Sequence, residues 1–258
     1  MRDFSVQCYR QLLESIKSQG YYFQTFHEYI ASPISTKLII LRHDVDKLPE
    51  NSLVTATIEK EIGIKGSYYF RAIPESWDEN IIKEISAFGH EIGYHYENMT
   101  TCKSDIDMGF ADFKMNLDKL RRLVPVTTIC MHGSPLSKWD SRDLWKKYDY
   151  KTLGIIGEPY FDVDFSNIFY LTDTGRRWDG YKVSLRDKIP QHQERWEEEG
   201  FVFHSTQDII NAANKGRLPS QIMITVHPQR WTDKPILWTK ELVWQGIKNQ
   251  VKRFIAHR

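Results

Sequence analysis

The stretch Leu38-Ile39-Ile40-Leu41-Arg42-His43-Asp44-Val45-Asp46 runs from four apolar residues directly into two aspartates. Such an apolar run is typical of a strand buried on both faces of a parallel sheet. Side chains alternate along a strand, so Asp44 and Asp46 are expected on the same side. A turn in which one Asp caps a helix after Pro49 would explain one acid, but not the pair. Because α/β folds bind ligands at the carboxyl ends of their strands, we interpret the pair as part of a metal or catalytic site.

Outward from this strand, the sequence alternates between expected strands and expected helices. We predict further strands at residues 64–71, 90–95, 126–131, 152–156 and 221–226, with helices between most of them. This alternation indicates a parallel sheet with right-handed crossovers. We therefore predict an α/β fold, a distorted (β/α) barrel of about seven parallel strands related to the TIM barrel. Residues 1–258 are expected to form a single domain, with an elaborated loop region at about 157–203.

The composition excludes several classes of protein. The formal net charge of +1 is spread along the 258 residues, which gives no footprint for nucleic acid. No apolar run is long enough to cross a membrane, and we predict no integral membrane segment. The three cysteines are widely spaced and odd in number, and no signal peptide is recognised, so we expect free thiols and a cytoplasmic location.

Histidines follow the ends of several other predicted strands. His95 ends one strand, His132 follows the next, and His227 follows the last. Any one of them alone is more often a structural residue. Together with the two aspartates they form a donor set suited to a divalent metal, which we predict to be zinc with an open position that activates water.

Three ordered motifs resemble those of the polysaccharide deacetylase family, carbohydrate esterase family four. The family's first motif, Phe-Asp-Asp-Gly, has its counterpart in His43-Asp44-Val45-Asp46. The second, Gly-His-Glu-Ile-Gly-Asn-His, is closely matched by Gly89-His90-Glu91-Ile92-Gly93-Tyr94-His95. The last places a histidine after the final strand, as in Ile224-Thr225-Val226-His227. The resemblance implies a distorted (β/α) barrel that uses a divalent metal to remove acyl groups from sugars.

The resemblance also implies roles for individual residues. It makes Asp44 the catalytic base, Asp46 and His95 metal ligands, and His227 the general acid. The family's second metal histidine should stand four residues after His95, where this sequence has Met99. His132 is our first candidate for the missing ligand, and Glu97 is the second. The family's third motif is replaced by a different sequence around His132.

Five residues are candidates for substrate binding. Arginine forks match carboxylate or phosphate groups, and tryptophan stacks on sugar faces. Arg42 is equally compatible with a structural ion pair, and the segment around residue 177 with a solvated loop that holds a buried tryptophan. The candidates are Arg42, Arg176, Arg177, Trp178 and Trp231.

The predicted function is that of a metal-dependent hydrolase that removes an acyl group from a sugar, and we expect this group to be N-acetyl. A cytoplasmic location favours a small-molecule or oligosaccharide substrate, such as a nucleotide- or lipid-linked precursor of a surface polysaccharide. One alternative is a deformylase or another hydrolase of non-peptide C–N bonds on the same fold. Another is a degenerate barrel that binds saccharide without hydrolysing it, which the substitution at Met99 suggests.

Overall fold

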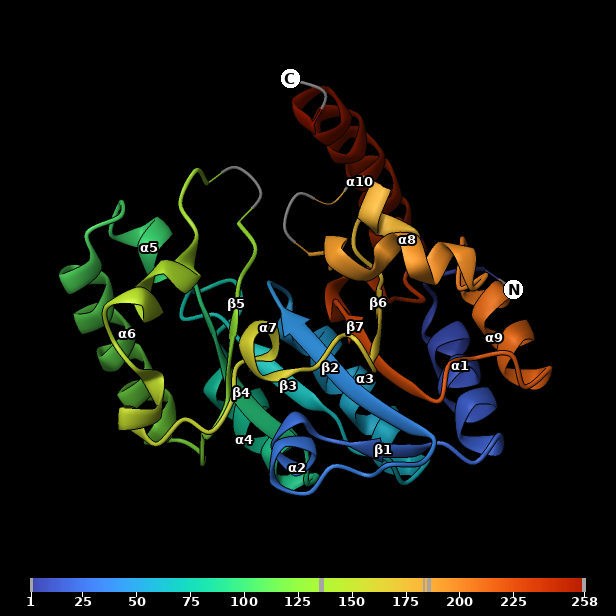
Figure 1. Cartoon of the computed structure of the whole chain (residues 1–258), viewed down its shortest axis with the longest axis horizontal. Helices are drawn as coiled ribbons and strands as arrows, with labels where there is room; N and C mark the ends of the chain where they lie inside the picture. The colour runs from blue at the N-terminus through green and yellow to red at the C-terminus, as the bar shows by residue number, and fades with distance from the viewer. Residues whose placement is uncertain (1, 135–136, 183, 185–186, 257–258) are drawn as a thin grey trace.

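A curled parallel sheet of seven strands forms the centre of the molecule (Figure 1). The computed structural model describes residues 2–134, 137–182, 184 and 187–256, without the side chains of residues 181 and 251–256. Six strands follow the order β5-β4-β3-β2-β7-β6, and β1 pairs with β2. The strands are β1 (Tyr22–Gln24), β2 (Leu38–Val45), β3 (Ser67–Phe70), β4 (Glu91–Tyr96), β5 (Ile129–Met131), β6 (Phe169–Thr172) and β7 (Gln221–Val226).

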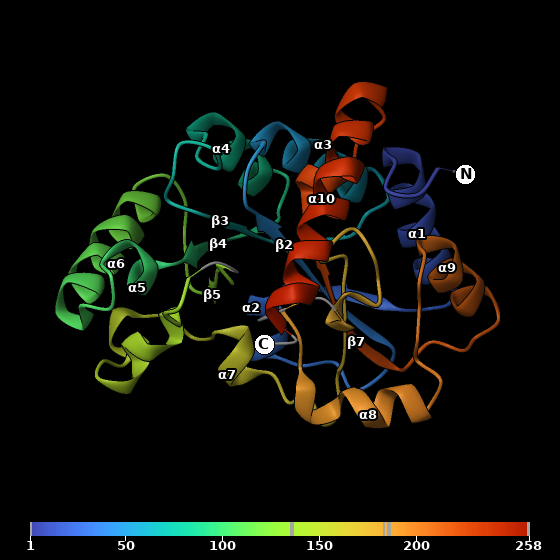
Figure 2. The same ribbon diagram turned by 90° about the horizontal axis from the view of Figure 1, so that it is seen from above.

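Helices connect the strands and cover the outside of the curled sheet (Figure 2). The α-helices are α1 (Val6–Ser18), α2 (Phe26–Ala31), α3 (Pro49–Glu61), α4 (Glu79–Ala87), α5 (Asn98–Thr101), α6 (Ile106–Arg121), α7 (Pro159–Asp162), α8 (Pro190–Glu198), α9 (Thr206–Asn214) and α10 (Pro235–Ala256). Short 3-10 helices are η1 (Ser141–Lys146), η2 (Tyr150–Leu153), η3 (Gly180–Lys182) and η4 (Pro228–Arg230). None of these described helices combines the length and apolar character needed to span a lipid bilayer.

This architecture is the predicted distorted (β/α) barrel. All eight residues of β2 are buried, which explains its continuous apolar run: the strand has neighbours on both edges and packed side chains on both faces. The parallel strands bring their carboxyl ends to one edge of the sheet. Asp44, His95 and His227 all lie at that edge, at the ends of β2, β4 and β7.

One predicted strand does not form and one strand was not predicted, both in the second half of the chain. Residues 152–156 were predicted to form a strand, but η2 occupies residues 150–153 and Gly154 follows it with a φ of +70°, in the left-handed region. The expected loop region at 157–203 contains β6, which pairs in parallel with β7. The short length of β6, four residues, gave no clear alternation to detect.

Candidate metal centre

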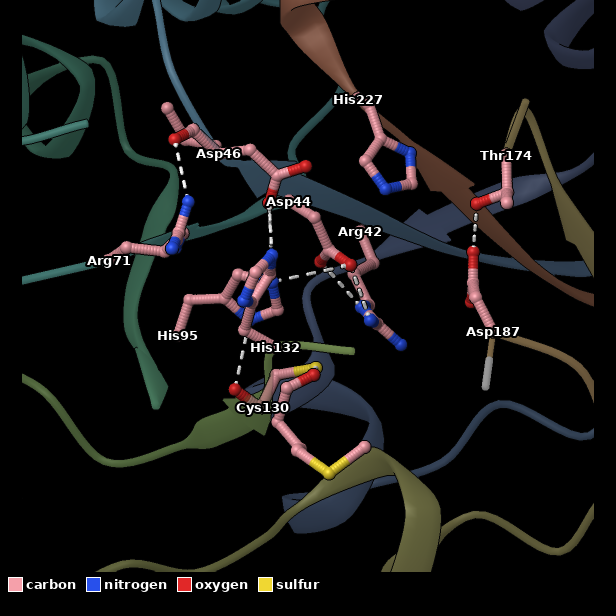
Figure 3. A network of polar contacts seen from close by, with 12 residues as sticks. Arg42, Asp44, Asp46, Arg71, His95, Cys130, His132, Thr174, Asp187 and His227 are labelled. Atoms are coloured by element: carbon pink, nitrogen blue, oxygen red, sulfur yellow. Dashed lines mark hydrogen bonds and ion pairs between the residues drawn. The ribbon is translucent and has the colours of Figure 1, made fainter. Parts of the chain in front are cut away.

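The carboxyl end of β2 supplies two carboxylates and an arginine to the same side of the strand (Figure 3). Arg42 donates from Nε to Asp44 Oδ1 at 2.8 Å and from its terminal nitrogen to Asp44 Oδ2 at 2.6 Å. Both side chains are almost fully buried. Such a two-pronged ion pair fixes the plane of the carboxylate. Arg42 therefore orients Asp44 and is itself shielded from solvent.

Asp46, His95 and His132 bring one ligand atom each to within 4.8 Å of one another. Asp46 Oδ1 lies 3.7 Å from His95 Nε2 and 3.4 Å from His132 Nε2. Burial disfavours the charged form of Asp46, but His132, His227 and His95 outweigh burial, so the pKa of Asp46 is lowered. Asp46 Oδ1 is buried and accepts no hydrogen bond from any described residue.

The other nitrogen of each ring faces an acceptor, which assigns the protons. His95 Nδ1 lies 2.9 Å from the carbonyl oxygen of Cys130, and His132 Nδ1 lies 3.0 Å from Glu97 Oε2. In a neutral ring each Nδ1 would then donate, which leaves the lone pair of Nε2 directed toward Asp46. Burial, reinforced by His132, lowers the pKa of His95 well below its usual value, so the ring is neutral at neutral pH.

Glu97 positions His132 and does not join the ligand cluster. Arg71 pairs with both oxygens of Glu97 at 2.8 Å, which holds the carboxylate behind the His132 ring. Burial opposes ionisation of Glu97, but His132 and Arg71 outweigh it and lower the pKa of Glu97 to about 2. This is the carboxylate–histidine arrangement that supports many protein metal ligands. It favours our first candidate, His132, over the second, Glu97.

The donor set fits a divalent metal such as zinc. One carboxylate oxygen without a hydrogen bond and two imidazole lone pairs are typical of a three-ligand zinc site. Met99 takes no part, because it is buried in α5 with its sulfur close to Gly109. Cys130 lies near Asp44 and His95, but burial raises the pKa of its thiol well above the usual value, so it is protonated and a poor ligand.

His227 lies beside the cluster and is held by a carboxylate of its own. Its Nδ1 lies 2.6 Å from Asp173 Oδ1, and Asp173 also accepts hydrogen bonds from Arg230 at 2.6 Å and from Trp231 Nε1 at 2.8 Å. Burial and Arg230 lower the pKa of His227, but Asp173 and Asp46 outweigh them and the pKa is raised. The histidine is thus protonated to higher pH than a free imidazole.

Two carboxylates near His227 were missed by the sequence analysis. Asp173 directly follows β6, and a recognised strand there would have revealed it. Asp187 accepts hydrogen bonds from Thr172 at 2.8 Å and from Thr174, and its pKa is lowered because His227 and Arg42 together outweigh burial (Figure 3). No spacing in the sequence connects Asp187 with these partners.

The structure brings none of the five substrate-binding candidates to an open face of this site. Arg176 donates to the carbonyl oxygen of Trp238, and Arg177 pairs with Asp179. Trp178 and Trp231 are buried, with their ring centroids 6.2 Å apart. Arg42 is the partner of Asp44. Trp231 reaches the site only through Asp173, so its observed part is to hold that carboxylate.

No family model and no curated protein matches the chain. Among solved structures it is similar to a CE4 family pseudoenzyme from Bacillus anthracis, with a TM-score of 0.42 and 13% sequence identity over 84% of this chain and 62% of that one. It is also similar to Bacillus subtilis PdaA, a family 4 carbohydrate esterase, with a TM-score of 0.41 and 12% identity over 92% of this chain and 84% of that one. The chain thus spans less than two thirds of the length of the pseudoenzyme.

Proposed function

We propose that the protein is a metal-dependent hydrolase that removes an acyl group, namely an N-acetyl group, from a sugar. The observation that carries the proposal is the convergence of Asp46, His95 and His132, with Asp44 and His227 beside them. Three ligands, a further carboxylate and a histidine with a raised pKa are the groups that hydrolysis of an amide requires.

Asp46, His95 and His132 would hold the metal, leaving a coordination position for water or substrate. When bound, the metal would polarise the acyl carbonyl and lower the pKa of water. His95 and His132 are already oriented for this task by the carbonyl of Cys130 and by Glu97. Little reorganisation is therefore needed on loading.

Asp44 and His227 would move the protons. Asp44 Oδ2 lies 3.7 Å from His95 Nε2, next to the ligand cluster, and Arg42 fixes its direction. Asp44 would accept a proton from the attacking water. His227, protonated and hydrogen-bonded through Nδ1 to Asp173, would donate the proton on Nε2 to the leaving nitrogen. The products are a free amine and a carboxylate.

Two alternative functions would use the same groups, and the product that is released distinguishes them. A deformylase would release formate instead of acetate from an acylated amino sugar. A protein that only binds saccharide would release neither. The sugar deacetylase proposal is supported by the three motifs that resemble carbohydrate esterase family four.

A pair of substitutions in β2 and just after it tests the assignment. Asp46→Asn should lose metal and activity together, because an amide is a much weaker ligand than a carboxylate. Asp44→Asn should keep the metal and lose about 10²- to 10⁴-fold in kcat, the usual contribution of a general base. Metal content by atomic emission, acetate release and the melting temperature would be measured for both variants.

Asp187→Asn is the matched control, since it removes a nearby, partly buried carboxylate outside the ligand cluster. The reverse pattern, with metal lost in the Asp44 variant and kept in the Asp46 variant, would refute the assignment. Wild-type protein that binds no zinc would refute the hydrolase proposal altogether.

A further inference from the structure

The polarity of helix α10 is the reverse of that expected for a surface helix, because its polar residues face the protein and apolar residues face outward. Glu241 and Gln245 are buried and hydrogen-bond to each other at 2.7 Å. Asn249, one turn further, donates to the carbonyl oxygen of Gly175 at 2.9 Å. A helix that packs only on its own domain normally turns its apolar stripe inward. The inward face of α10 is instead held largely by polar contacts.

The outward face of the same helix is apolar. Ile236, Val243 and Ile247 are exposed at 83%, 57% and 52%. Their spacing of seven and four residues places them on one line along the helix. Trp244 flanks this line and is also exposed. We call these four side chains the outer face of α10. In Figure 1 the helix rises from the body of the protein, away from the sheet.

The charges along α10 are almost all positive. Lys240 and Lys248 lie among the described side chains, and Lys248 Nζ is 5.3 Å from the ring centre of Trp244. The sequence adds Lys252 and Arg253 in the last turns of the helix. Its single acid, Glu241, faces inward and pairs with Lys47. An apolar face with tryptophan and flanking lysines is the pattern of helices that lie in a membrane interface.

We propose that the outer face of α10 binds an anionic lipid surface. Apolar side chains would enter the boundary between headgroups and acyl chains, while Lys240, which is exposed on the same side of the helix, reaches along its stem to anionic headgroups. A second copy of the chain fits less well. With Val243 and Ile247 in neighbouring core positions, the core positions on either side would be Lys240 and Gln250, which are both polar. Pairing would also bring lysines of like charge together.

The position of α10 connects this surface with the metal centre. Lys47, which directly follows Asp46, pairs with Glu241 of the helix at 3.3 Å. The field of Asp46 also reaches Lys248, whose pKa is lowered by burial and by Lys47. A lipid-bound α10 would therefore hold the site close to the membrane. If the proposed function holds, the acylated sugar is one that is presented on a lipid carrier.

Vesicle flotation with the full chain tests the proposal. The vesicles are phosphatidylcholine alone and phosphatidylcholine mixed with phosphatidylglycerol. Wild-type protein should float with the anionic vesicles and only weakly with the neutral ones. The double variant Val243→Glu, Ile247→Glu should bind anionic vesicles at least about tenfold more weakly, since two buried apolar contacts are lost. Its matched control is Met108→Glu, Met115→Glu on α6, where both side chains are about as exposed and binding should stay as in wild type.

Equal binding by the Val243/Ile247 variant, or no binding of wild type to anionic vesicles, would overturn the proposal. A dimer seen by analytical ultracentrifugation and abolished in this variant, without vesicle binding, would assign the outer face to a second copy. Zinc content, melting temperature and hydrolysis of a water-soluble acylated sugar should be unchanged in the variant. If wild-type protein binds no zinc or hydrolyses no acylated sugar, the proposed function is overturned. The flotation result would still test lipid binding, because it does not depend on that function.

Discussion

Strand β2 carries a carboxylate–histidine cluster on each of its two faces, and the two clusters differ in one respect. On the face opposite the metal centre, Glu59 Oε1 accepts from Tyr9 at 2.5 Å and from Tyr68 at 2.7 Å, and lies 2.9 Å from His43 Nε2. His43 Nδ1 faces the carbonyl oxygen of Ser67 at 3.2 Å. Both nitrogens of this histidine therefore have partners.

The neighbouring His90 is occupied in the same way. Its Nδ1 accepts from the backbone N–H of Gly66, and its Nε2 faces the carbonyl oxygen of Ala56, each at 3.1 Å. At the metal centre, by contrast, Nε2 of His95 and of His132 makes no hydrogen bond to a described residue, and the facing carboxylate oxygens lie 3.4–3.7 Å away. Histidine and carboxylate together do not suffice for a metal site. The Nε2 atoms without a hydrogen-bond partner distinguish the open cluster from the closed one.

The largest effect that separates the clusters is expected from Glu59→Gln. Breaking a buried ion pair costs about 3–5 kcal/mol, so this variant should be strongly destabilised in urea while its folded fraction still binds one metal per chain. Burial opposes ionisation of Glu59, but His43 and His90 outweigh it and lower its pKa. The corresponding stability is complete above the unfolded pKa and is lost as the pH falls through the lowered value, so wild type and variant should converge at low pH. Loss of metal from the folded variant would show that the two faces of β2 are not independent.

Much of this comparison was accessible from the sequence, and the missing part has a physical cause. Asp44, Asp46, His95, His132 and His227 all lie at or just after the carboxyl ends of strands, and these ends meet at one edge of a parallel sheet. The partners that orient the rings have no such rule. Glu97, which was expected as a possible ligand, turns to Arg71 and His132 because of side-chain hydrogen bonds that no spacing predicts. The sequence alone therefore predicted which side chains meet at this edge of the sheet, but not the directions in which they point.

Glu97→Gln tests how much the orientation of a proposed ligand contributes to the difference between the two clusters. The variant weakens the contact that orients His132, but it removes no ligand. An amide oxygen can still face His132 Nδ1, but the charge that supports the ring is lost, and Arg71 loses its ion pair. Loss of such a supporting carboxylate typically costs 10- to 100-fold in metal affinity. Competition with a zinc chelator should show this drop, and activity should return when zinc is in excess. An affinity equal to that of wild type would mean that the charge of Glu97 is not needed to orient His132.

The smallest effect, and the most specific, is expected for the third carboxylate–histidine pair, Asp173 and His227. Asp173 Oδ1 lies 2.6 Å from Nδ1 of the His227 ring. In this pair the carboxylate affects the protonation of the histidine, and neither residue belongs to the ligand cluster. In the proposed mechanism His227 is the general acid, and its raised pKa keeps it protonated, so activity should fall as the pH rises through that pKa. In Asp173→Asn, burial and Arg230 still lower the pKa of His227 but the opposing carboxylate is gone, so the alkaline limb of kcat should move to lower pH.

Asp187→Asn is the control, because it removes a charge near His227 that makes no hydrogen bond to the ring. A shift of the limb in the Asp173 variant alone, with metal content unchanged, would assign the control of the proton to the direct hydrogen bond. An equal shift in both variants would assign it to the summed field of the two carboxylates, and no shift in either would remove His227 from the role of general acid.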